Sequence, residues 1–169
     1  MASLQRILNL LFVFVLSLVL IASYVYQFTA STIPCSLCLL QRLAIFAIII
    51  GLLLNLRFGI KAEHYGLSLL GAILGRSISL RQMALHICPL ESPPYPGEPV
   101  FGFDLYVWAF IIFACCIVAI AVLLILFGFT NHRPVPASSG FFEKVAITLV
   151  AFIALAGAVI TFLTNGLII

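Results

Sequence analysis

Two cysteines separated by two residues are the side chains of this sequence best suited to chemistry. Cys35 and Cys38 follow Pro34, and Arg42 comes four positions after Cys38. If a helix begins at Pro34, Cys35 lies at its N-terminus, where unpaired backbone amides and the helix dipole stabilise a thiolate. Residues four apart share a helix face, so the Arg42 guanidinium would favour the Cys38 thiolate as well. The pattern indicates thiol–disulfide chemistry by two unequal sulfurs.

The composition predicts that these residues lie in or beside a membrane. Of the 169 residues, 64% are hydrophobic and only 8% are charged, whereas a soluble domain carries about 25% charged residues. The net charge of +3 is small, and no cluster of Lys and Arg interleaves with aromatic residues, so we expect no nucleic-acid partner. Membrane lipid is the expected surrounding.

Five apolar runs are each long enough to cross a bilayer, which takes about 20 residues in a helix. Backbone groups in lipid must be satisfied within the segment, so all five should be helices. We expect them at residues 7–26, 39–56, 65–85, 105–129 and 145–163. No small-residue cleavage site follows the first run, which is therefore expected to stay as a span. The predicted fold class is an all-α membrane protein.

Basic residues give the orientation of these spans. With five spans, the loop and terminal charges Arg6, Arg57, Lys61, Arg133 and Lys144 all fall on one side, and that side is predicted to be cytoplasmic. The opposite side then holds both cysteine-bearing loops, residues 27–38 and 86–103. Arg42 is different because it lies inside a span, where a charge is costly and marks a functional site by default.

The other three cysteines have different surroundings. Cys115 and Cys116 lie near the middle of the fourth span, and we expect them to be packing residues because Cys is readily buried. Cys88 lies in the loop 86–103, whose Pro and Gly content prevents a regular helix.

Three stretches resemble the DsbB family, the bacterial inner-membrane disulfide bond formation proteins. PCSLCLLQR, residues 34–42, resembles the signature of the family. GRSISLRQMALHI, residues 75–87, is similar to the end of its third span, and FGFDLYVWAFIIF, residues 101–113, to the entry to its fourth. The resemblance implies a four-helix bundle over residues 1–130, with a cytoplasmic N-terminus and periplasmic active-site loops. It also implies that the protein reoxidises a DsbA-like periplasmic protein with a thioredoxin fold and passes the electrons to ubiquinone or menaquinone.

The resemblance also implies roles for single residues. Cys35 and Cys38 match the redox pair beside the quinone, Arg42 matches the arginine that contacts it, and Gln82 falls where the third span approaches the quinone ring. Family members usually carry a second cysteine pair in the later periplasmic loop, and here that loop has Cys88 alone. Cys88 is either a partner for a transient bridge with Cys35 or idle.

The C-terminal part of the chain also departs from the usual four-span pattern. A connector over residues 131–144 leads to an extra predicted transmembrane helix within residues 145–169, which carries no ionisable side chain in its apolar part.

Two other functions remain compatible with the residues. Cys35, Cys38, His86 and Cys88 form a possible Cys₃His set for zinc or copper(I), although Arg42 would repel a cation. Alternatively, the chain is a membrane scaffold in which a Cys35–Cys38 disulfide is only structural.

Overall fold

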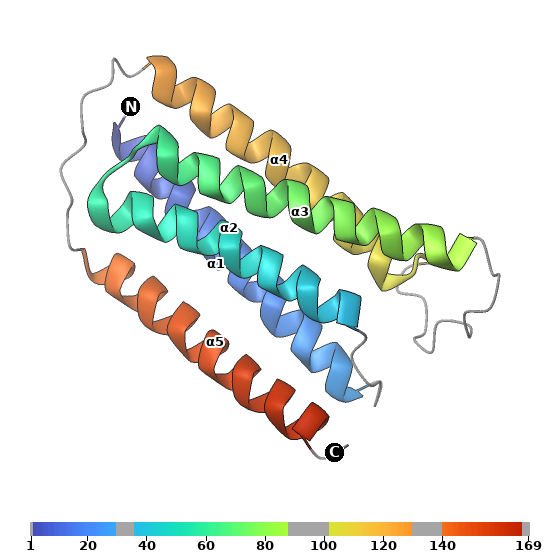
Figure 1. The fold of residues 1–169 in the computed structure, drawn as a ribbon. Helices are drawn as coiled ribbons and strands as arrows, with labels where there is room; N and C mark the ends of the chain where they lie inside the picture. Colours follow the sequence, from blue (N-terminus) through green and yellow to red (C-terminus); the bar gives the residue numbers. More distant parts are fainter. Residues whose placement is uncertain (1, 30–35, 88–101, 130–139, 167–169) are drawn as a thin grey trace.

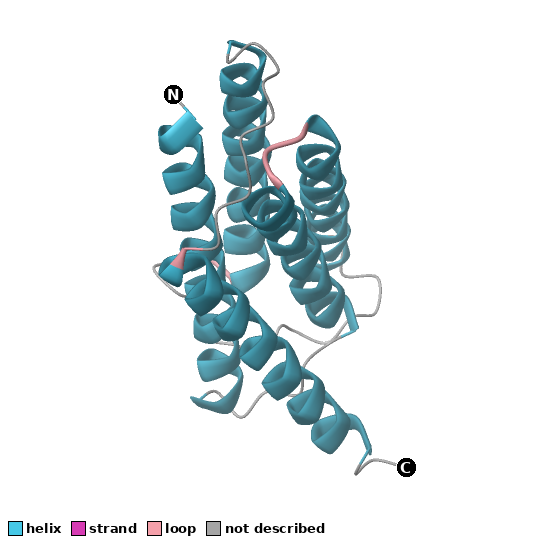
Figure 2. Cartoon of the chain, turned by 90° about the vertical axis from the view of Figure 1, so that its left-hand side faces the viewer, coloured by secondary structure: helices cyan, strands magenta, loops and turns pink. Residues whose placement is uncertain are grey.

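The computed structural model describes residues 2–29, 36–87, 102–129 and 140–166, and these form five helices (Figure 1). The helices are α1 (Ala2–Thr29), α2 (Ser36–Phe58), α3 (Ala62–Ile87), α4 (Leu105–Phe129) and α5 (Phe141–Gly166). Figure 2, coloured by secondary structure, shows that the described residues form helices with a few short loop segments and no strand. The predicted all-α fold is confirmed.

Four of the five helices are long and apolar enough to cross a membrane. These segments are Leu4–Thr29, Ser36–Phe58, Leu105–Phe129 and Phe141–Phe162. The third predicted span, 65–85, also forms a helix, but α3 is the least apolar of the five and carries Arg76 and Arg81 along its length. It nevertheless lies alongside α2 and α4, its two most extensive neighbours (Figure 1).

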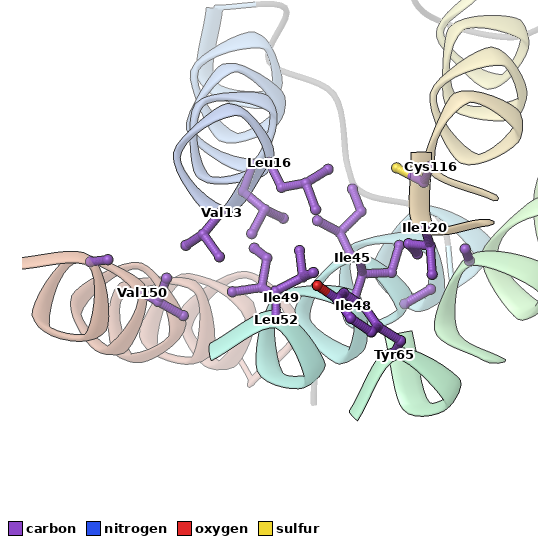
Figure 3. Packing of buried hydrophobic residues seen from close by; sticks show 14 of the residues in the cluster. Val13, Leu16, Ile45, Ile48, Ile49, Leu52, Tyr65, Cys116, Ile120 and Val150 are labelled. Atoms are coloured by element: carbon purple, nitrogen blue, oxygen red, sulfur yellow. The ribbon is translucent and has the colours of Figure 1, made fainter. Parts of the chain in front are cut away.

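The interior of the bundle is an apolar cluster to which all five helices contribute. Figure 3 shows Val13 and Leu16 of α1 beside Ile49 of α2, with Val150 of α5 nearby, and these side chains are nearly or fully buried. Cys116 belongs to the same cluster, as expected of a packing residue, whereas Cys115 is exposed. Large apolar side chains also cover the outer surface, which suits a protein surrounded by lipid.

Two glycines bring α3 close to its neighbours. A Cβ at Gly71 would lie 3.2 Å from the backbone oxygen of Ala44 in α2, and a Cβ at Gly75 would overlap the ring of Phe113 in α4. Small residues at such contacts allow membrane helices to pack closely. This packing holds the middle of α3 against α2 and the first half of α4.

The helix α5 packs mainly on α1 and less extensively on α2. Its residues Ala146, Val150 and Ile153 are buried in the shared apolar cluster. The predicted connector, 131–144, lies largely outside the described residues. The extra helix itself is therefore part of the bundle rather than a separate appendage.

Candidate functional site

The candidate site lies at the end of the bundle where α1 and α3 end and α2 and α4 begin (Figure 1). α2 begins at Ser36, so Cys38 lies in its first turn, and the Cys38 side chain is partly buried. Its predicted partners Cys35 and Cys88 lie outside the described residues. The structure therefore describes the inner of the two sulfurs in the cysteine pair.

The first group around Cys38 is a chain of two buried amides. The amide nitrogen of Gln82, in α3, lies 3.7 Å from the Cys38 sulfur as a hydrogen-bond donor. The side-chain oxygen of Gln82 accepts a hydrogen bond of 2.9 Å from the side-chain nitrogen of Gln41. Gln82 is 2% exposed and Gln41 is 8% exposed.

The hydrogen bond from Gln41 fixes the orientation of the Gln82 side-chain amide. Because Gln41 has donated to the oxygen of Gln82, the group that Gln82 turns toward Cys38 is its NH₂ group, a donor. A donor in a site shielded from water stabilises a charged acceptor more than a neutral one. The Gln82 amide therefore stabilises a thiolate at Cys38 relative to the same site without this donor.

Arg42 is held against α1. One terminal nitrogen, Nη1, donates to the side-chain oxygen of Gln27 at 2.6 Å, and the other, Nη2, donates to the backbone oxygen of Ser23 at 3.0 Å. The guanidinium carbon lies 4.3 Å from the centroid of the Tyr24 ring. These contacts fix the position of the Arg42 guanidinium, which is permanently charged and lies one helical turn deeper than Cys38.

The end of α3 is also joined to the start of α4. His86 Nδ1 lies 2.8 Å from the backbone oxygen of Gln82, and the His86 ring stacks on Tyr106, with centroids 5.0 Å apart. The Tyr106 hydroxyl donates to Asp104 at 2.7 Å. These contacts brace the turn of α3 that carries Gln82.

Among the residues that the structure describes, no three His, Cys, Asp or Glu side chains gather in the manner of metal ligands. The Cys₃His hypothesis needs Cys35 and Cys88, which lie outside those residues, so it still rests on the sequence.

Several residues of this site were not singled out from the sequence. Gln41 and the α1 residues Ser23, Tyr24 and Gln27 contact the predicted residues directly. A signal was available for Gln41, because a polar side chain inside an apolar run usually has a buried partner. The predicted loop 27–38 includes Gln27, but in the structure α1 continues to Thr29 and Gln27 is buried at 7% exposure.

Comparison with known protein families gives the class of the chain. The family model described as "Disulfide bond formation protein DsbB" matches residues 5–94, just over half of the sequence. The chain therefore belongs to the DsbB family, and it is a multi-pass membrane protein of disulfide bond formation with a thiol oxidoreductase role. No curated protein and no solved structure matches the chain.

The matched segment holds α1 without its first three residues, all of α2 and α3, and the residues Cys38, Arg42 and Gln82. It ends before α4, so the likeness of residues 101–113 to the family rests on the sequence motif alone.

Proposed function

We propose that this protein is a quinone-dependent thiol oxidase of the bacterial inner membrane. It takes electrons from a reduced, DsbA-like thioredoxin-fold protein in the periplasm through Cys35 and Cys38, and it passes them to ubiquinone or menaquinone. In this proposal the N-terminus is cytoplasmic and the end of the bundle with Cys38 is periplasmic. The observation that carries the proposal is the contact of the Cys38 sulfur with the Gln82 amide, one helical turn from Arg42 in α2.

The first half of the cycle is thiol–disulfide exchange with the periplasmic partner. A thiolate of the partner attacks the sulfur of Cys35 in the Cys35–Cys38 disulfide, and Cys38 leaves as a thiolate. The second thiolate of the partner then attacks the partner's own sulfur in the mixed disulfide and releases Cys35. The partner gains a disulfide and this protein becomes a dithiol. A stabilised leaving thiolate speeds such exchange, and the Gln82 amide supports that role for Cys38.

The second half restores the disulfide. The Cys35 and Cys38 dithiol gives up two electrons and two protons as it closes, and a quinone, which takes both and becomes a quinol, supplies the oxidising power. The residues present suit such a ring, since Arg42 and Gln82 carry N–H groups that can donate to carbonyl oxygens. Arg42 would favour the negative charge that an oxygen gains during electron transfer.

Cys88 enters the proposal as a third cysteine of the cycle. Its thiolate attacks Cys35 in the oxidised pair and forms a transient Cys35–Cys88 disulfide while Cys38 is released as a thiolate. This exchange involves no net oxidation, and it needs the Cys35–Cys38 disulfide, so it falls after the quinone half of the cycle and before the exchange with the partner.

Turnover with a reduced thioredoxin-fold dithiol protein and a short-chain quinone tests the proposal. Cys38→Ser is expected to abolish quinone reduction, while Cys115→Ser, an exposed position in α4, is expected to retain it. Cys88→Ala separates the two versions of the cycle, because a slowed turnover supports the transient bridge and an unchanged rate excludes it. Stoichiometric metal in the purified protein that is lost in His86→Ala would instead favour the metal site.

A further inference from the structure

The helix α5 reaches the candidate site through one close contact. Gly157 of α5 is buried, and a Cβ at this position would overlap the hydroxyl of Tyr24 and lie 2.8 Å from the ring carbon that bears it. Any side chain at position 157 would therefore require Tyr24 or α5 to move. The absence of a side chain at this point lets α5 pack directly on the outer end of the Tyr24 ring.

The same ring is one of the contacts that hold Arg42. The guanidinium carbon lies 4.3 Å from the ring centroid, within the range of a cation–π interaction, which strengthens where water is excluded. Ser23 and Gln27, on either side of Tyr24 in α1, accept hydrogen bonds from the same guanidinium. One turn of α1 therefore sets the place of Arg42, and α5 contacts that turn at Tyr24.

We propose that α5 is a positioning element for Arg42, acting through the contact of Gly157 with Tyr24. This inference rests on the proposed function and adds to it a role for the helix that the usual four-span pattern lacks. An arginine side chain has many rotamers, and its usefulness to a planar ligand depends on the few that its neighbours allow. By fixing the Tyr24 ring, α5 restricts the guanidinium to the rotamer that the quinone meets.

The test compares Gly157→Ala with a matched glycine substitution. Gly66→Ala in α3 is the control, because a Cβ there meets nothing within 4 Å. The first readout is the dissociation constant of a short-chain ubiquinone, and separately of a menaquinone, for the oxidised protein, which cannot reduce them. The second readout is the KM for quinone during turnover. We expect Gly157→Ala to weaken binding and raise KM about five- to tenfold, as for the loss of one cation–π contact, and Gly66→Ala to match the wild type.

Two further variants show that the effect passes through Tyr24 and Arg42. Tyr24→Phe keeps the ring and removes the hydroxyl, the atom that a Cβ at position 157 overlaps most, so Gly157→Ala/Tyr24→Phe is expected to recover part of the lost affinity. In an Arg42→Lys background, Gly157→Ala should cause little additional loss, because the group that α5 positions is already changed. If Gly157→Ala acts through a loss of packing unrelated to Arg42, its loss of quinone affinity should instead add in full to the loss caused by Arg42→Lys.

The outcomes are separable. If the wild type neither binds nor reduces a quinone, the proposed function fails. If the wild type does both and Gly157→Ala behaves like Gly66→Ala, or its effect adds fully to Arg42→Lys, the role of α5 is overturned. Should Gly157→Ala not fold, Tyr24→Leu provides the same test without adding volume at the interface, and wild-type quinone affinity in that variant would equally overturn the inference.

Discussion

The side-chain amide nitrogen of Gln82 lies 3.7 Å from the sulfur of Cys38, and the two residues come from different helices, α3 and α2. The resemblance to the family had associated Gln82 with the quinone ring. The structure adds a contact with the sulfur itself. Gln82 is therefore in a position to act on the cysteine pair whether or not a quinone is bound.

Replacing Gln82 with leucine removes the donor that faces Cys38 while keeping a similar volume. A hydrogen bond to a charged group is worth about 1.5–3 kcal/mol, so the thiolate fraction at neutral pH should fall about tenfold or more. The measurement is the rate of alkylation of Cys38 in a Cys35→Ser background at fixed pH. Ser77→Ala is the matched control on α3, since Ser77 is exposed and its hydroxyl donates to the backbone oxygen of Ile73 in the same helix. An unchanged alkylation rate in Gln82→Leu would show that the amide does not act on the sulfur.

Gln41→Leu tests the second link of the amide chain. Without Gln41, the oxygen of Gln82 loses its 2.9 Å donor, and the Gln82 amide no longer has a fixed direction. We expect Cys38 alkylation to slow by about threefold, less than in Gln82→Leu, because the Gln82 donor is still present. In a double-mutant cycle, Gln41→Leu should have almost no effect once Gln82 is leucine. Independent, additive effects of the two substitutions would show that Gln41 does not act on Cys38 through Gln82.

Arg42→Lys keeps the positive charge and removes the planar fork that bonds two α1 acceptors, Gln27 and the backbone oxygen of Ser23. Lys and Arg are not equivalent at such sites. The KM for quinone should rise about tenfold, with a smaller change in kcat. The control is Arg57→Lys, an exposed residue in the last turn of α2, at the other end of that helix. Equal effects at the two positions would mean that Arg42 contributes only general charge.

Tyr65→Phe tests a buried polar contact at the opposite end of the bundle. The Tyr65 hydroxyl accepts a hydrogen bond of 2.7 Å from Asn9, and both residues are fully buried. Removing the hydroxyl should lower the free energy of unfolding by about 1 kcal/mol, seen as a lower Tm in detergent. Quinone reduction by the folded variant should stay near the wild-type rate. The contact joins the N-terminal parts of α1 and α3, whereas the candidate site lies where these two helices end.

Much of this architecture could be predicted from the sequence because it follows from local pattern. Apolar runs of spanning length predicted all five helices, and helical spacing predicted that Arg42 lies one turn below Cys38. The helix ends were less predictable. α1 extends through Gln27, whose side chain accepts a hydrogen bond from Arg42 of the next helix, and no local pattern contains such a contact.

The contacts between helices were the part that the sequence could not supply. Gln82 meets Cys38, and Gly157 meets Tyr24, only because of how the helices pack. A glycine in an apolar run gives no sign of which side chain it will touch. The role of α5 therefore became visible only in three dimensions.

The measurement that tests the central claim most directly is thiol trapping on the purified protein. The protein is reduced, mixed with ubiquinone or with menaquinone, quenched with an alkylating reagent, and mapped by mass spectrometry. The account predicts that Cys35 and Cys38 lose their alkylatable thiols rapidly with at least one quinone, while Cys115 and Cys116 keep theirs. If neither quinone removes these two thiols, the protein does not pass electrons from this cysteine pair to a quinone, and the proposed function is wrong.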